Sequence, residues 1–401
     1  MVSDQRSMRL LLLIQLISMG AMEMSGPFWP LQIQALLAPE DLHYSGVLSA
    51  LVYAGPMLAA MIFTPAWGRL GDRVGHRWML IRALGALALC QGLAAWLTDP
   101  WALMMTRVLQ GALGGFIAAA QAYALCLHSG HDRGRIMGQL QSATALGSLL
   151  GPVLGGALMQ AYGFVWLCHA AALLCMLCAA GCLKLPDPRA RSVAVSGQSS
   201  LRVPAGWLGS LVLIIVLVQS AKVMQQPFYA LYVAEVLGGT PAVIGLTYAI
   251  SAAGLMLSAP LWGKLFDRRA PARTLQVIEQ VTWLCAVTLA VAAMANQWAP
   301  FIASRLLWGV WQGALLPVAY ALIATTLPAS RQGFALGVGN SAAKAGGLVG
   351  IFIGGIGVSV VGLSNSFWMV VVTYAIAALA IRLVRSNHPL PTLSSHSNNN
   401  P

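Results

Sequence analysis

The chain consists of long apolar runs separated by short polar breaks. Twelve runs are long enough to cross a membrane as a helix, because a span needs about 20 mainly apolar residues. They lie near 9–34, 44–67, 77–98, 101–127, 136–160, 163–184, 206–234, 240–264, 273–296, 298–327, 332–360 and 363–384. The runs are continuous, unlike the short alternating strands of a membrane barrel. The pattern predicts an all-α integral membrane protein with 12 transmembrane helices.

Composition agrees with this pattern. Hydrophobic residues make up 58% of the 401 residues and charged residues only 8%, which is more apolar surface than a soluble core can hide. The first run follows Arg6 and Arg9, is longer than the apolar part of a cleavable signal peptide and contains Glu23. We therefore expect it to remain as the first helix.

Charge is distributed unevenly over the polar breaks. The basic residues lie in alternate breaks, on the side of Arg6 and Arg385. The opposite breaks hold acids and no Lys or Arg: Glu40, Asp41, Asp99 and Glu235. Because cytoplasmic loops of membrane proteins are enriched in Lys and Arg, this predicts that both termini are cytoplasmic. The net charge of +12 is then explained by topology, and we expect no nucleic-acid partner.

The longest polar break divides the chain in two. It runs from Leu185 to Pro204 and is rich in Pro, Ser and Arg, as is typical of an exposed linker. The predicted organisation is an N-terminal six-helix bundle (1–184), a cytoplasmic linker (185–204), a C-terminal six-helix bundle (205–385) and a disordered cytoplasmic tail (386–401).

The two predicted bundles repeat one another. A charged turn containing Pro65, Trp67, Gly68, Asp72 and Arg73 recurs 195 residues later as Pro260, Trp262, Gly263, Asp267 and Arg268. Arg107 recurs as Arg305, and the glycines of 138–156 recur 199 residues later. The chain is therefore a six-helix unit written twice, as in many secondary transporters.

Three of these motifs resemble signatures of the major facilitator superfamily (MFS). GRLGDRVGHR at 68–77 is similar to its loop signature, Arg107 in LMMTRVLQGALGG to its fourth-helix signature, and GSLLGPVLGG at 147–156 to the fifth-helix signature of its antiporter branch. The resemblance covers essentially the whole chain. It implies the MFS fold of two pseudo-symmetric six-helix bundles and a relationship to the 12-helix drug/proton antiporters.

The doubled loop predicts a charged latch that holds one face of the transporter closed. Its members are Gly68, Asp72, Arg73, Gly75 and Arg77, with Asp267 and Arg268 in the second half. Glycines permit a tight loop, and an acid can accept bonds from a neighbouring helix N-terminus. The alternative is a solvated loop whose charges only set topology. The recurrence of the acid favours the latch.

Small residues in the fifth span predict a helix interface. Gly147, Gly151 and Gly155 follow one another at every fourth position, with Pro152 beside them. Such strips let two helix backbones touch. A sliding interface between the halves and simple helix packing are both compatible with this spacing.

Charges within the spans are the main candidates for function, since each costs about 2.5–3.5 kcal/mol at the bilayer centre. They are Glu23, Arg107, Lys222, Arg305 and Lys344. Glu23 and Lys222 occupy equivalent positions in the two halves. The resemblance implies that first spans line a central cavity, that Glu23 carries the proton and that Arg107 modulates it. The alternative is a permanent ion pair of Glu23 with Lys222 or Arg107.

The substrate cavity is expected to combine the remaining cations with aromatic and amide side chains. The candidates are Lys222, Arg305, Lys344, Trp29, Gln225, Gln226 and Tyr229. Two functions compete: a proton-coupled exporter of small organic compounds, and an exporter of an anionic metabolite such as a citrate-type siderophore. The first is the main interpretation, and the cation-rich set is the feature that would suit the second.

Other classes of protein fit the sequence poorly. Cys175, Cys178 and Cys182 share a helical face, but no His or acid accompanies them, so we expect no metal site and no cofactor. No nucleophile–base arrangement or phosphate-binding loop indicates an enzyme. The expected partners are a small-molecule substrate, protons and the lipid bilayer. We expect a monomer in the inner membrane of a bacterium.

The charge pattern makes a direct topology prediction. Reporter fusions in the breaks at Glu40 and Glu235 should give extracytoplasmic signals, whereas fusions in the basic breaks should give cytoplasmic ones. A cytoplasmic reporter signal at Glu40 or Glu235 would overturn the predicted orientation.

Overall fold

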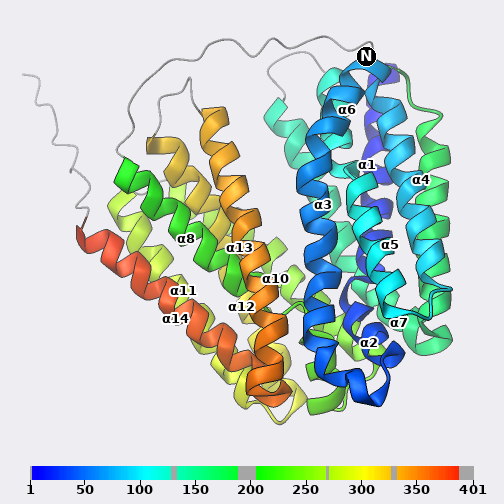
Figure 1. Cartoon of the computed structure of the whole chain (residues 1–401). Helices are drawn as coiled ribbons and strands as arrows, with labels where there is room; N and C mark the ends of the chain where they lie inside the picture. Colours follow the sequence, from blue (N-terminus) through cyan, green and yellow to red (C-terminus); the bar gives the residue numbers. More distant parts are fainter. Residues whose placement is uncertain (1, 128–132, 188–204, 268–270, 327–331, 388–401) are drawn as a thin grey trace, which may run out of the picture.

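The computed structural model describes residues 2–127, 133–187, 205–267, 271–326 and 332–387. In these ranges every regular element is a helix, and the helices form two bundles that lie side by side (Figure 1). Large apolar side chains cover the outside: Ile62 is 71% exposed and Val360 is 80% exposed. Such a surface is stable only in lipid.

The first bundle contains the elements up to α7. They are α1 (Val2–Met24), η1 (Gly26–Phe28), α2 (Trp29–Leu36), η2 (Pro39–Tyr44), α3 (Ser45–Val74), α4 (His76–Ala94), α5 (Pro100–Leu113), α6 (Phe116–Leu127) and α7 (Arg133–Cys182). The long α7 is two spans joined at Gly163, where φ is +80°. A positive φ of this kind is readily adopted only by glycine.

The second bundle contains the remaining elements. They are α8 (Ala205–Val223), α9 (Tyr229–Leu231), the π-helical η3 (Tyr232–Val236), α10 (Pro241–Asp267), α11 (Pro271–Met294), α12 (Trp298–Thr326), α13 (Gln332–Val361), η5 (Leu363–Asn365) and α14 (Ser366–Asn387). Within the described ranges, 8 helical stretches are long and apolar enough to cross a membrane. One of these stretches, α7, contains two spans, and α4, α8 and α12 supply three more, so the fold is the predicted one of 12 spans in two six-helix halves.

The first span of each half is broken, which the apolar pattern did not predict. The span expected near 9–34 ends its α-helix at Met24, and the span expected near 206–234 ends its helix at Val223. Pro27 and Pro227 follow within a turn. A proline ring clashes with the carbonyl group four residues earlier and has no N–H to donate, which favours a helix break at these positions.

The two halves touch at one end of the bundles. We call the end where α1 begins and α14 ends the terminal side, and the end where α2 lies the far side (Figure 1). Gly46 of α3 and Gly355 of α13 lie backbone to backbone near the far side. Gly245 of α10 packs in the same way against α7.

Hydrogen bonds between the halves lie at the same end. Gln34 Nε2 donates to Glu235 Oε1 at 2.7 Å, and the Ala242 backbone N–H donates to Gln160 Oε1 at 3.2 Å. All of these contacts place the closed end of the described structure at the far side.

The glycine strip of the fifth span packs within its own half. Gly147, Gly151 and Gly155 face the backbone of α1 at Gly20 and Met24, where an added Cβ atom would collide with carbonyl oxygens. The strip is therefore an interface between two helices of the same half. Of the two possibilities that the spacing left open, this is simple helix packing and not a sliding interface between the halves. The other half has the same arrangement, with glycines of α13 against α8.

The interface between halves uses the neighbouring face of α7. Pro152 and Gly156 are each one position further along than a strip glycine, which turns them by about 100° around the helix axis. Gly156 meets Pro241 and Gly245 of α10, and the Pro152 carbonyl also faces Gly245. The fifth span thus carries two separate small-residue surfaces.

The close approach of α7 and α1 predicts a measurable stability difference. Gly151→Ala places a methyl group against backbone that cannot move away, and it should destabilise the protein by about 1–3 kcal/mol. Gly138→Ala on the same helix has no atom within 4 Å of the new methyl group. It should be neutral or slightly stabilising. Thermal melting of the two variants in detergent tests this, and equal melting temperatures would contradict it.

Candidate functional site

A cavity of about 320 Å³ lies between the two halves. Its walls come from α7 of the first half and from α8, α10 and α12 of the second, together with the residues that follow α8. The polar and charged lining residues are Gln141, Thr144, Ser148, Lys222, Gln225, Gln226, Tyr248, Ser251, Arg305, Trp308 and Gln312. The cavity lies on the terminal side of the contacts that join α7 to α10.

Arg305 is fixed in the wall of this cavity. Its guanidinium donates to Gln225 Oε1 and, at 3.1 Å, to Ser251 Oγ. The group also lies against two aromatic rings, 4.6 Å from the centre of Tyr229 and 4.7 Å from that of Trp308. The residue is only 1% exposed. These contacts stabilise a buried cation and hold it in one position.

Arg107 repeats this arrangement in the first half. Its guanidinium donates to Gln110 Oε1 and lies 4.4 Å from the centre of the Trp29 ring, and its Nε donates to the Val52 carbonyl at 3.4 Å. In both halves an arginine of the fourth span therefore lies over an aromatic side chain that follows the break in the first span. Arg107 does not line the cavity.

Glu23 lies in the last turn of α1, directly before the break. Its carboxylate is close to Gly26, since Oε2 lies 3.1 Å from where a Cβ atom of residue 26 would be. The Tyr53 hydroxyl donates to the Gly26 carbonyl at 2.6 Å. Tyr53, Tyr248 and Arg107 are all within electrostatic range of Glu23.

Lys222 occupies the equivalent position in the last turn of α8 and reaches the cavity. In the described part of the chain, its ammonium group has no hydrogen-bond or ion-pair partner, and Glu23 has no ion pair either. The permanent ion pair that the sequence left open is thus absent from this conformation for these residues.

The other predicted cavity residues divide into three groups. Gln225 and Gln226 line the cavity with Lys222. Trp29 and Tyr229 are buried, and each lies against one of the arginines. Lys344 is exposed on α13 and is not among the lining residues. Successive residues of a helix point in different directions, so a position within a membrane span does not show whether its side chain faces the cavity.

The sequence did not predict the lining residues of α7 and α10. Gln141, Thr144 and Ser148 recur at helical spacing on an otherwise apolar span, and Tyr248 and Ser251 do so on α10. This spacing was a usable signal, because polar side chains on one stripe of a membrane helix usually face protein or water.

The predicted latch is only partly described. Gly75 ends α3 with a φ of +102°, which explains the requirement for glycine. Asp72 Oδ1 lies 3.6 Å from His76 Nε2, and Arg77 Nη1 donates to the Leu185 carbonyl at 3.1 Å. These bonds stay within the first half.

Other latch residues are exposed or lie outside the described set. Gly68 and Arg73 are exposed. The Asp267 side chain and Arg268 lie outside the described residues. Closure of the terminal side by these residues therefore remains a prediction.

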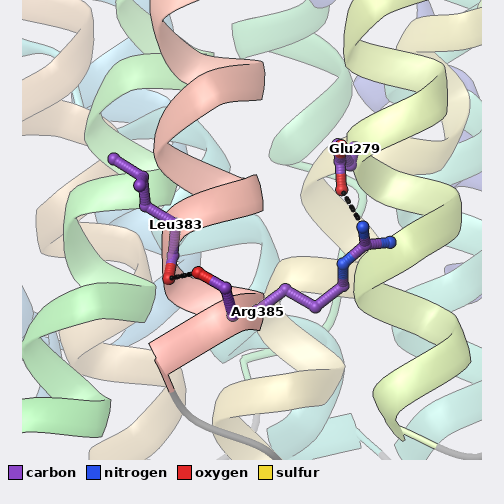
Figure 2. Close-up of polar contacts among 4 residues, drawn as sticks. Glu279, Leu383 and Arg385 are labelled. Carbon is purple, nitrogen blue, oxygen red and sulfur yellow. Dashed lines mark hydrogen bonds and ion pairs between the residues drawn. The ribbon is translucent and has the colours of Figure 1, made fainter.

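A second acid lies away from the cavity. Figure 2 shows Arg385 of α14 extending towards Glu279 of α11, with a nitrogen–oxygen distance of 3.2 Å. The Glu279 side chain is 11% exposed. The pair joins two peripheral helices of the second half, which is a structural role.

Comparisons with known proteins give a consistent result. The family model described as Major Facilitator Superfamily matches residues 11–218 and 211–399. The chain is 28% identical over 386 residues to the "Staphyloferrin B transporter" of Staphylococcus aureus (strain NCTC 8325 / PS 47), covering 92% of this chain and 91% of that protein. It is 30% identical over 311 residues to "Multidrug resistance protein MdtG" of Rahnella sp. (strain Y9602), covering 74% and 73%.

Solved structures share the fold. The crystal structure of a bacterial homologue of the human lysosomal transporter Spinster, in an inward-facing and unoccupied conformation, superposes with a TM-score of 0.76 over 98% of this chain and 99% of that one, at 13% identity. The D-xylose-proton symporter superposes with a TM-score of 0.75 at 16% identity. The doubled six-helix fold, the repeated motifs and the family match agree: the chain belongs to the major facilitator superfamily.

Proposed function

We propose that the protein is a proton-coupled exporter of small organic compounds that works by alternating access. The observation that carries the proposal is the polar cavity between the two halves, which lies on one side of the contacts that join them. In alternating access, the binding site takes up substrate from one side of the membrane while contacts between the halves close the other side. The multidrug and siderophore transporters among its relatives support export.

The charge of the cavity favours a narrower candidate, an anionic metabolite such as a citrate-type siderophore. Lys222 and Arg305 are the charged residues among those that line it, and no acid is found in that set. A cationic drug would bind against two positive charges, whereas a carboxylate would gain a charge-assisted hydrogen bond. The amide side chains around them suit the hydroxyl and carbonyl groups of such a compound.

Lys222 is the cation that is available to the substrate. Both terminal nitrogens of Arg305 already donate within the protein, and the residue is only 1% exposed, so little of its guanidinium is accessible to a substrate. Lys222 has no such partner among the described residues, and it lies at the C-terminal end of α8. The partial negative charge of a helix C-terminus stabilises an ammonium group there. We therefore assign the first contact with a carboxylate to Lys222.

Glu23 is the proposed proton carrier. It is the acid at the break of the first span, and Arg107 and two tyrosines surround it without an ion pair that would lock it in one state. A carboxyl group exposed alternately to the two sides of the membrane can load and release a proton. One pH unit of gradient then supplies about 1.4 kcal/mol per proton.

The proposal includes an orientation. With the terminal side in the cytoplasm, as the loop charges predict, the described conformation would accept substrate from inside the cell. We propose a monomer in a bacterial inner membrane, since each chain contains both halves of the cavity.

Loss of the Lys222 charge should weaken binding of an anion. We expect Lys222→Gln to raise the Kd for staphyloferrin B by about tenfold to a hundredfold, the usual worth of a charge-assisted hydrogen bond. Lys222→Arg should retain most of the affinity. The matched control is Lys264→Gln, which removes an exposed lysine of α10. Calorimetric titration of the purified variants measures these constants.

The same titration decides between the two substrate classes. Ethidium, an organic cation, should bind Lys222→Gln as well as or better than it binds the wild type. Unchanged staphyloferrin B affinity in Lys222→Gln would contradict the assigned role. Binding of ethidium but not of staphyloferrin B by the wild type would favour the broader exporter.

Removal of the titratable group at Glu23 should uncouple transport from the proton gradient. In inverted membrane vesicles, Glu23→Gln keeps the shape of the side chain, so substrate exchange without a gradient should persist while acceleration by an imposed pH gradient disappears. Glu279→Gln is the control, because that acid pairs with Arg385 at the periphery. A full response of Glu23→Gln to the pH gradient would remove Glu23 from the mechanism.

A further inference from the structure

The fourth span of the first half is interrupted, and its counterpart is not. α5 ends at Leu113, Gly115 has a φ of +90°, and α6 begins at Phe116. In the second half, α12 continues without a break from Trp298 to Thr326. The two glycines therefore divide the fourth span into two helices in one half only.

Arg82 of α4 binds the carbonyl groups that this break leaves without helical partners. Its Nη1 donates to the Leu113 carbonyl at 2.9 Å and its Nη2 to the Gly114 carbonyl at 2.8 Å. Trp67 Nε1 donates to the preceding carbonyl, that of Ala112, at 2.6 Å. The Arg82 guanidinium lies 3.7 Å from the centre of the Trp67 ring. Buried carbonyls without partners are costly inside a membrane, so these bonds stabilise the bent span.

The break separates helices with different neighbours. α5 packs chiefly on α3, where Gly111 lies against the backbone of Pro56. α6 packs chiefly on α4, which carries Arg82. Arg82 thus links α4, the helix on which α6 packs, to the end of α5. A cavity of about 180 Å³ beside the break, lined by Gly68, Gly115 and small alanines of α6, leaves room for α6 to move.

The second half has the tryptophan but not the arginine. Trp262 Nε1 donates to the Val310 carbonyl at 2.8 Å, as Trp67 does in the first half. The positions that correspond to Arg82 under the repeat, 277 to 280, contain no Lys or Arg. The half that has Arg82 has the broken fourth span, and the half without such an arginine has the continuous α12.

We propose that Arg82 is a positioning residue for transport: it holds the fourth span bent at Gly114 and Gly115 in this conformation, and α6 pivots about these glycines when the terminal side closes. The charged loop after α3 is connected to this hinge through Trp67. Movement at the terminal side is then unequal, with a bending helix in the first half and a rigid α12 in the second. The inference rests on the alternating access proposed above.

Spin labels on the two parts of the span test the hinge. With Cys126→Ser removing the one cysteine that is not buried, labels at Met105 of α5 and Leu125 of α6, both exposed, would lie about 30 Å apart along the span. In lipid nanodiscs, moving from acidic to alkaline pH should change this distance in the wild type. A label pair at Leu246 and Leu261 on the unbroken α10 should keep its distance. A constant Met105–Leu125 distance under all conditions would overturn the hinge.

Transport by Arg82 variants tests the clamp itself. Arg82→Gln should lower the maximal rate about tenfold, the effect of about 1.4 kcal/mol, with an unchanged KM for whichever of staphyloferrin B and ethidium the wild type moves. Arg82→Lys should restore part of the rate, and Arg273→Gln, at an exposed position of the second half, should behave as wild type. A wild-type rate in Arg82→Gln would refute the clamp.

The two experiments separate this inference from the proposed function. If neither compound is transported by the wild type, the proposed function fails while the label distances still report on the hinge. If Arg82→Gln does not fold, the same distances in the otherwise intact chain decide the question.

Discussion

The structure depends on one constraint: a polar group that is buried within a membrane protein must find its partner inside the chain. Among the described residues, the first span of each half and the fourth span of the first half are interrupted. Each interruption leaves backbone carbonyl groups without helical partners. Tyr53 binds the carbonyl freed at Gly26, and Arg82 binds those at Leu113 and Gly114. The side chains of neighbouring helices therefore fix where helices can break, and the breaks in turn fix where Glu23 and Lys222 are presented.

The same constraint separates structural charges from functional ones. Arg305 is surrounded by a glutamine, a serine and two aromatic rings, and Arg385 pairs with Glu279. These charges have partners within the fold. Lys222 is the exception among the described cavity residues, because its ammonium group reaches the cavity without such a partner. An unpaired cation in this cavity is the group that the proposed anionic substrate would bind.

Much of the architecture follows from the sequence because hydropathy and repetition are strong signals. The apolar runs and the doubled motifs predicted the 12 spans and the family. Pro27 and Pro227 can be read from the sequence as possible helix breakers. Whether a helix breaks also depends on side chains of other helices that bind the freed carbonyl groups, such as Tyr53, and the sequence does not show these contacts. The partner of the Gly147 strip could not be predicted for the same reason, since spacing identifies a smooth face without naming its neighbour.

The central claim is that an organic anion and a proton occupy the carrier alternately. Proton release on binding measures this most directly, in detergent solution with little buffer and with staphyloferrin B adjusted to the same starting pH. If the account is right, addition of the compound to the purified protein acidifies the solution in step with binding, because a carrier that exchanges the two does not hold the anion and the Glu23 proton at the same time. Binding detected by calorimetry with no accompanying change in pH would contradict it.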